Sequence, residues 1–395
     1  MFGRYADVLR VPAFRKTELI SLLARIPQYG FGITLTLHVV TTLHMSYTAA
    51  GVVAAVYTVA AAIAAPWRGR LLDRQGMRRT LLPSLIIVPL VWGIAPFLPY
   101  WLLIVACAVG GLFSLPLFSL VRQVIVANAP DGARRTALSL DSVIVEINFM
   151  IGPLLAIVAV TQFGTRPTLV ALTLLTSVGG GLLALYNPPL IAPREAGDER
   201  VPEPAPPRRE WLSPAVLGVY GAVLAGGIVL AGTEVSLVAA LRTFQHTELL
   251  GLVMTVWSAG SAVGGLIYGA WHRSIPASIL LTGLAALTLP VAAATNVPMI
   301  FAIVAVSGFF CAPLISATVD ELNGRFPESV RGEAMGWHGS ALTAGSSLGP
   351  PVVGMVLDAF GWRAGFLMSG GVGLAIAALV MLVTAGRRRL ANAEG

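Results

Sequence analysis

Two long runs without a charged side chain flank a short basic turn, and this arrangement most restricts how the chain can fold. The runs cover residues 47–66 and 80–121. Each is long enough to cross the hydrocarbon core of a bilayer at least once. A turn cannot remain in hydrocarbon, because its backbone polar groups would lack partners, so residues 67–79 form a loop at a membrane surface. The loop carries five arginines and one aspartate, which predicts that this surface is cytoplasmic.

The basic balance of the chain follows from its membrane topology. The sequence is 56% hydrophobic and only 11% charged, with a mean hydropathy of +0.80 and a net charge of +7, whereas soluble domains contain about 25% charged residues. Of the 26 Lys and Arg residues, 21 fall in the tails or in every second loop. We therefore expect no nucleic-acid partner, and the anionic partner of these residues is the lipid headgroup layer.

The apolar runs predict twelve membrane spans of about 20 residues each. They cover residues 18–41, 47–66, 80–97, 101–125, 136–160, 167–187, 212–241, 248–270, 277–294, 298–321, 332–357 and 363–385. An even number of spans places both termini on one side, and the distribution of arginines predicts the cytoplasmic side of a plasma membrane.

A proline-rich, charged segment at residues 188–211 divides the spans into two groups of six. It lacks an apolar stripe, which is typical of an extended linker. The predicted organisation is a cytoplasmic segment 1–17, a six-helix bundle 18–187, the cytoplasmic linker 188–211, a second bundle 212–385 and a basic cytoplasmic tail 386–395.

The two groups of spans repeat each other in sequence. At a shift of 197 residues, Gly152-Pro153 aligns with Gly349-Pro350, and Arg134 aligns with Arg331. Towards the start of each group the shift is 200 residues, and Gly69 aligns with Gly269. Two related six-helix halves are a transporter architecture, in which the binding site lies between the halves near the middle of the membrane.

The basic loop contains the pattern Gly-x-Leu-x-Asp-Arg-x-Gly-x-Arg-Arg, formed by Gly69, Asp73, Arg74, Gly76, Arg78 and Arg79. This pattern resembles the signature loop between helices 2 and 3 of the major facilitator superfamily, and with the repeat the resemblance covers essentially the whole chain. It implies an all-α membrane protein of two pseudo-symmetric six-helix bundles, closest to the drug and metabolite:proton antiporter branch. Gly152, Pro153, Gly349 and Pro350 are expected to kink their helices, because proline frees a backbone carbonyl.

A few charged residues fall within or at the ends of the spans, where they are costly unless they face the protein interior. They are Arg25, Arg122, Asp141, Glu146, Glu234, Asp320 and Glu321. For Arg122, Asp320 and Glu321, near helix ends, a structural role is favoured. Glu146 and Glu234 lie deeper and are candidate proton sites, with a fixed salt bridge as the alternative for each.

Four contacts are predicted for charged side chains of the spans and loops. Asp73 should cap the start of the helix at 332–357, where a carboxylate is stabilised by the helix dipole; the resemblance implies that this contact latches the outward-open state. Two pseudo-symmetric pairs are expected, Asp73 with Arg122 and Arg273 with Asp320 or Glu321. Arg25 and Glu146 should pair, because both lie at a similar rise from the cytoplasmic face.

Aromatic residues within the spans are candidates to line an apolar cavity. They are Tyr29, Phe31, Phe149, Tyr220, Trp257 and Trp337. No metal or cofactor motif is present, and Gly345-Ser-Ser-Leu-Gly349, although it matches a nucleophile-elbow pattern, lacks the strand that this motif needs. No enzyme activity is therefore expected.

The predicted function is proton-coupled efflux of a small amphiphilic molecule by alternating access. The protein is expected to act as a monomer, with its substrate, protons and membrane lipid as partners. Uptake or facilitated diffusion of a metabolite by the same fold is one alternative, and a non-transporting membrane receptor is another.

Overall fold

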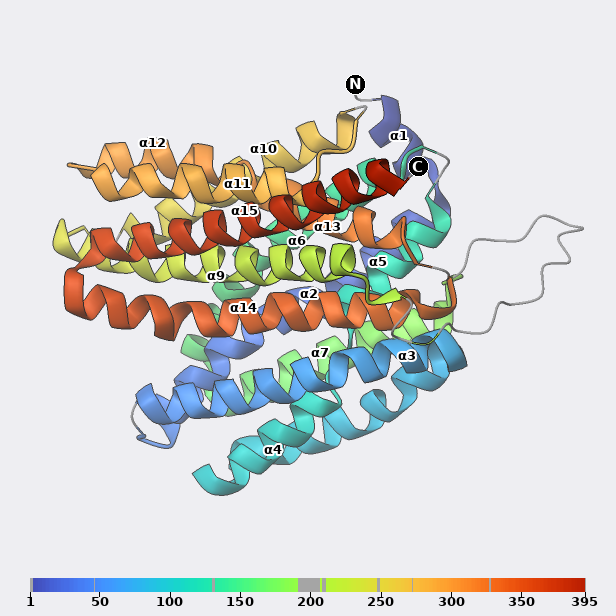
Figure 1. Ribbon diagram of the computed structural model, residues 1–395. Helices are drawn as coiled ribbons and strands as arrows, with labels where there is room; N and C mark the ends of the chain where they lie inside the picture. Colours follow the sequence, from blue (N-terminus) through green and yellow to red (C-terminus); the bar gives the residue numbers. More distant parts are fainter. Residues whose placement is uncertain are drawn as a thin grey trace, which may run out of the picture.

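The computed structural model describes residues 3–45, 47–129, 132–190, 207, 211–246, 249–271, 273–326 and 328–394, and these ranges contain helices and no strand (Figure 1). In the first half the helices are α1 (Gly3–Arg10), α2 (Pro12–Leu37), α3 (Tyr47–Ile94), α4 (Tyr100–Leu112), α5 (Leu117–Asn128), α6 (Arg134–Phe163) and α7 (Thr165–Tyr186). In the second half they are α9 (Pro214–Thr243), α10 (Leu250–Ala270), α11 (Ala277–Thr288), α12 (Val297–Gly308), α13 (Cys311–Asn323), α14 (Arg331–Phe360) and α15 (Trp362–Glu394). Short π or 3-10 turns lie at His38–Thr42, Ala95–Phe97, Leu289–Ala293 and Glu328–Val330.

The helices account for the predicted spans. Among the described residues, nine helical segments are long and apolar enough to cross a membrane. One of them, Ala49–Phe97, contains two spans, and α2 and the shorter segment Ala277–Ala293 complete a set of twelve. The predicted all-α membrane fold is confirmed.

The helix ends differ from the predicted spans at several places. The element α3 consists of two helices that meet at a kink at Gly76, whose φ of 75° is a conformation that glycine adopts readily. The fourth and tenth spans are each broken into two helices, α4–α5 and α12–α13. Helix α15 continues to Glu394, so the predicted basic tail extends this helix. Most of the predicted linker lies outside the described residues.

The buried apolar side chains show how the two halves meet. We call the end of the bundle that carries the Gly76 turn and the first residues of α2, α6 and α14 the loop end. Figure 1 shows α1 and the last turns of α15 at this same end. One core cluster, here called the shared core, lies at the loop end and combines first-half residues such as Leu120 and Val124 with second-half residues such as Val319 and Met335. The other three clusters each belong to a single half.

Candidate functional site

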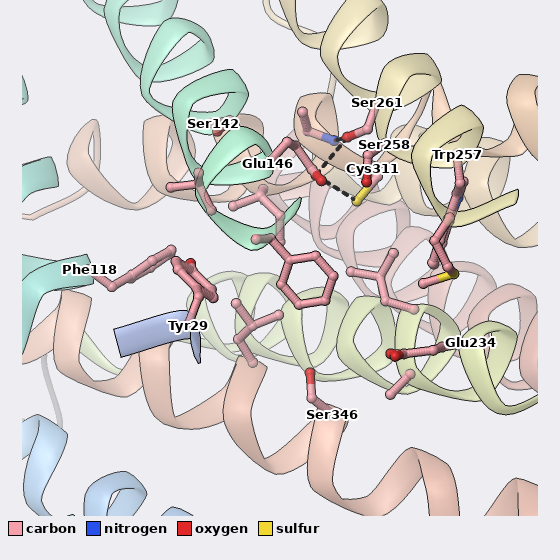
Figure 2. Close-up of a pocket in the computed structure, with 18 of the residues that line it drawn as sticks. Tyr29, Phe118, Ser142, Glu146, Glu234, Trp257, Ser258, Ser261, Cys311 and Ser346 are labelled. Atoms are coloured by element: carbon pink, nitrogen blue, oxygen red, sulfur yellow. Dashed lines mark hydrogen bonds between the residues drawn. The ribbon is translucent and has the colours of Figure 1, made fainter. Parts of the chain in front are cut away.

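A cavity of about 410 Å³ lies between the two halves. The first half contributes side chains from α2, α5 and α6, and the second half contributes side chains from α9, α10, α13 and α14 (Figure 2). Most of the wall is apolar or aromatic, and the polar groups are few. This is the usual composition of a small-molecule site, in which apolar walls give contact area and a few polar groups fix orientation. Of the predicted aromatic residues, Tyr29, Phe149 and Trp257 line this cavity, together with Pro350.

Glu146 is the carboxylate held most closely in the cavity wall. Its Oε1 accepts a hydrogen bond from Ser261 Oγ at 2.8 Å and lies 3.6 Å from Cys311 Sγ. Ser261 in turn accepts the backbone N–H of Ala312 at 3.1 Å, which fixes the serine between α10 and α13. Within the described part of the chain, no cationic side chain lies within ion-pair distance of Glu146.

Glu234 lies on α9, and its carboxylate also faces the cavity (Figure 2). The described residues give its carboxylate no hydrogen bond or ion pair. The cavity therefore contains two acidic side chains from opposite halves, Glu146 and Glu234, and no arginine of the described ranges forms an ion pair with either.

The predicted pair of Arg25 and Glu146 is wrong, because Arg25 binds Asp141 instead. Arg25 Nη1 lies 2.7 Å from Asp141 Oδ1, and Arg122 Nε lies 2.8 Å from Asp141 Oδ2. Glu18 joins the same group, with its Oε2 at 3.6 Å from Arg25 Nη1. All four side chains are almost completely buried. Two arginines and two acids at one site are the kind of arrangement that keeps buried charge tolerable, and loss of one partner would leave the others uncompensated.

Depth along the helices did not distinguish Asp141 from Glu146, which lie only five residues apart on α6. Side chains on a helix lean towards its N-terminus. Both α2 and α6 begin at the loop end, so the long side chain of Arg25 reaches below its own backbone position. It meets the acid that is nearer to the loop end.

The signature loop closes against α14, and the predicted capping contact is confirmed. Asp73 Oδ1 accepts the backbone N–H of Gly332 at 2.6 Å, and Oδ2 accepts that of Glu333 at 2.9 Å. Arg70 binds the Glu333 carboxylate through two nitrogens at 2.7 and 2.8 Å. Gly69 lies directly on the backbone of Gly332, where a Cβ would collide with the Gly332 carbonyl oxygen. We call this contact between α3 and α14 the first seam.

The other members of the signature loop lie outside the first seam. Arg78 donates to the carbonyl oxygens at the end of α7, Ala184 at 3.0 Å and Leu185 at 3.1 Å. Arg74 and Arg79 are exposed at the loop end.

The two halves also meet at the loop end through α6 of the first half and α10 of the second half. We call this pseudo-symmetric counterpart of the first seam the second seam. The Thr136 hydroxyl donates to the Gly269 carbonyl, and the Tyr5 hydroxyl from α1 donates to the Leu266 carbonyl. Arg135 lies 3.8 Å from Asp320, a loose ion pair at a partly exposed position.

The two predicted swapped pairs are wrong. Arg122 is occupied by Asp141 rather than Asp73. In the second half, Asp320 lies 3.8 Å from Arg135. Glu321 accepts a hydrogen bond from the backbone N–H of Ala277 at 2.6 Å and forms an ion pair with Arg325 at 3.4 Å. Arg273 is exposed.

The other predicted aromatic residues lie outside the cavity. Phe31 lies against Trp92 in a first-half core cluster, with ring centroids 4.5 Å apart. The Tyr220 hydroxyl donates to the Ala334 carbonyl at 3.1 Å, and Trp337 is partly exposed outside the cavity. Helices α6 and α14 continue through Pro153 and Pro350 without a break. At these places Gly152 allows close contact with α2 and Gly349 allows close contact with α9.

Several residues of the site were not anticipated. Glu18 stands at the first position of its predicted span, where an acid normally reaches the surface. Ser261 is a small polar residue in an apolar helix and gives no periodic signal. His338 could have been found, because the shift of 197 residues places it at the position equivalent to Asp141. Phe118 had no signal in the sequence that separates a cavity aromatic from a core aromatic.

Comparisons with known proteins identify the family. The model of the Major Facilitator Superfamily matches residues 18–249 and again residues 227–394. The crystal structure of the human organic anion transporter MFSD10 (TETRAN) is similar in fold, with a TM-score of 0.70 and 18% identity over 95% of this chain and 99% of that chain. No curated protein matches the chain. Because the two family matches together span nearly the whole sequence, this chain belongs to the Major Facilitator Superfamily.

Proposed function

We propose that the protein is a proton-coupled exporter of a small amphiphilic molecule, of the drug and metabolite:proton antiporter type. The observation that carries this proposal is the position of Glu146. It is a carboxylate in the wall of an apolar cavity between the halves, held by a serine and a thiol and without a cationic partner among the described residues.

Alternating access is supported by the way the halves meet. The first and second seams and the shared core all lie at the loop end. The clusters beyond the cavity belong to one half each. With the loop end on the cytoplasmic side of the plasma membrane, as the arginines predict, this arrangement corresponds to an outward-facing state.

Proton coupling is supported by charge balance. A carboxylate at membrane depth is costly unless a cation or a proton neutralises it. Arg25 and Arg122 are both engaged with Asp141, so a proton is the simplest counter-charge for Glu146. Binding and release of that proton in different conformations would link the proton gradient to movement of the halves.

The cavity supports a small amphiphile as substrate. A volume of about 410 Å³ accommodates a drug-sized molecule. The lining combines Phe149, Leu230, Met254 and Trp257 with the acids Glu146 and Glu234, which suits an apolar body with a polar group. MFSD10, whose fold is similar, is an organic anion transporter, and we include organic anions among the compounds to be tested.

The test is transport by the purified protein, expected to be a monomer, in liposomes with an imposed pH gradient. A panel of fluorescent amphiphiles, organic anions and metabolites is measured with and without an uncoupler. We expect at least one compound to accumulate against its gradient, and we expect the uncoupler to abolish that accumulation.

The decisive variant is Glu146→Gln, with Glu234→Gln as the matched control from the other half. Glu146→Gln should exchange substrate across the membrane but no longer concentrate it, whereas Glu234→Gln should still pump. A folded Glu146→Gln protein that concentrates substrate as the parent does would remove Glu146 as the proton site, and Glu234 would become the candidate.

Uptake or facilitated diffusion is the alternative within the same fold. It predicts accumulation in the opposite direction, or equilibration that an uncoupler does not affect. A receptor without transport activity predicts no flux under any gradient, together with saturable binding of a compound to the cavity.

A further inference from the structure

A three-layer stack of side chains forms the wall of the cavity nearest the loop end. The ring of Phe118 lies with its centroid 4.2 Å from the guanidinium carbon of Arg122. It also lies 5.5 Å from the ring of His338, with the two planes inclined by 16°. Phe118 and Arg122 belong to α5 in the first half, and His338 belongs to α14 in the second half. The stack therefore joins the two halves.

The stack lies at the boundary between the cavity and the shared core. On α14, Leu342 lines the cavity, His338 follows about one turn nearer the loop end, and Ala334 follows after another turn in the shared core. On α13, Ile315 lines the cavity and Val319 is in the shared core. Any route from the cavity to the loop end between these helices passes the level of the stack.

The two outer layers are held in place by their own half. His338 Nε2 lies 2.9 Å from Thr318 Oγ1, and Arg122 is bound to Asp141 and to Ser142 Oγ at 3.0 Å. Both outer layers are fully buried, whereas Phe118 is half-buried and faces the cavity (Figure 2). An aromatic ring between a cation and a second ring is stabilised by both contacts.

We propose that Phe118 is the inner gate of the cavity and that His338 is the surface of the opposite half against which it closes. When the halves separate at the loop end, the ring loses His338 and leaves with Arg122 on α5. When they close, the ring returns and separates the cavity from the shared core. This inference goes beyond the proposed function, because it concerns access to the cavity and holds whether or not protons drive transport.

The experiment measures access to the cavity from each side of the membrane. Ser346 lines the cavity on α14, so Ser346→Cys is the reporter in a background of Cys107→Ser and Cys311→Ser. A membrane-impermeant thiol reagent is added to vesicles of either orientation, which is assigned with a terminal tag. Phe118→Ala should raise the labelling rate from the loop side about tenfold, equal to about 1.4 kcal/mol, and should leave the rate from the far side unchanged. His338→Ala should act in the same direction.

Conservative and matched variants make the result specific. Phe118→Tyr and His338→Phe keep the stack and should keep the reporter protected from the loop side. Phe149→Ala removes another cavity aromatic that lies against Tyr29, with centroids 5.9 Å apart, and should leave loop-side labelling unchanged. Should Phe118→Ala not fold, Phe118→Leu keeps most of the volume without the stacking and takes its place. Loop-side labelling that stays at the parent rate in folded Phe118 and His338 variants, or rises equally in Phe149→Ala, would overturn the proposal.

Discussion

The first and second seams occupy equivalent places in the two halves but are closed by different groups. In the first seam a carboxylate, Asp73, caps the start of α14, and a bidentate ion pair lies beside it. In the second seam the equivalent of Asp73 is the exposed Arg273, and neutral hydroxyl groups make the close contacts. The sequence repeat thus preserves the pairing of helices, α3 with α14 and α10 with α6, and changes the groups that hold each pair together.

This difference indicates that the two seams resist opening to different degrees. Charge-assisted hydrogen bonds to backbone N–H groups are roughly twice as strong as neutral ones. The first seam should therefore act as the latch of the closed loop end, and the second seam as the weaker partner. Substitutions at equivalent places in the two seams test this difference in strength.

The largest effect is expected from Gly69→Ala compared with Gly269→Ala. At Gly69 the new methyl group collides with a backbone carbonyl, which cannot move without shifting a helix. At Gly269 it lies 2.6 Å from the Ser139 Cβ and 2.6 Å from the Tyr5 hydroxyl oxygen, and Tyr5 is on the short helix α1. Overpacking typically costs about 1–3 kcal/mol, so Gly69→Ala should lower the ratio of closed to open protein by roughly 5- to 150-fold. Gly269→Ala should reduce it less.

Spin-label distances between exposed positions 79 and 324 at the loop end measure this population. Both variants should retain the helical circular dichroism and monodispersity of the parent. Equal opening in the two glycine variants would contradict the asymmetry of the seams.

The next effect is expected from Asp73→Asn compared with Arg273→Ala. The asparagine side chain lacks the negative charge that the start of α14 stabilises. It also has only one oxygen that can accept a hydrogen bond, where Asp73 uses two. This should destabilise the closed loop end by about 1–2 kcal/mol and reduce transport while expression is intact. Arg273→Ala changes an exposed side chain, so the free energy of closing the loop end should stay within about 0.5 kcal/mol of the parent value. Full transport activity in Asp73→Asn would remove the latch role.

A smaller effect is expected from Arg70→Ala compared with Arg135→Ala. The Arg70 side chain is 34% exposed, so solvent screens its pair with Glu333, and we expect a loss of about 1 kcal/mol from the closed state. Arg135 and Asp320 are 3.8 Å apart and partly exposed, so their separation should cost about 0.5 kcal/mol or less. Both effects should fall as salt concentration rises, and salt-independent opening would argue against an electrostatic cause.

The smallest effect is expected from Tyr5→Phe, which removes one neutral hydrogen bond and leaves the buried ring in place. The expected loss is about 0.5 kcal/mol, at the low end for a neutral hydrogen bond. It should appear as faster hydrogen exchange at the start of α6 and in α10 and not in α14. Faster exchange confined to α14 would contradict our assignment of the Tyr5 hydrogen bond to the second seam.

The sequence predicted the positions of these contacts better than the partners in them. The shift of 200 residues aligned Gly69 with Gly269, which lie in the first and second seams, but the contact between α6 and α10 was not predicted. The capping role of Asp73 followed from a carboxylate facing a helix start. The pairs of Arg25, Arg122 and Arg273 were wrong because depth in the membrane does not determine which way a side chain points around its helix. Five residues along α6 turn the direction by about 140°, and this rotation is set by packing between helices, which the sequence alone does not specify.

The cavity was predictable in place and only partly in composition. Its location followed from the repeat, because two related halves leave their site between them. Tyr29, Phe149 and Trp257 were anticipated, whereas Phe118 was not, and it follows a break between α4 and α5 that the sequence did not predict. Such breaks depend on the neighbouring helices as much as on the local residues.

The shared core has a thermodynamic consequence for the working cycle. It contains Leu120, Val124, Val319 and Met335, which are inaccessible to water while the loop end is closed. Opening that end would hydrate part of this apolar surface, and hydration of apolar surface carries a positive heat capacity. The equilibrium between the closed and open forms should therefore show a curved dependence on temperature, and cooling should favour the open form as the hydrophobic contribution weakens.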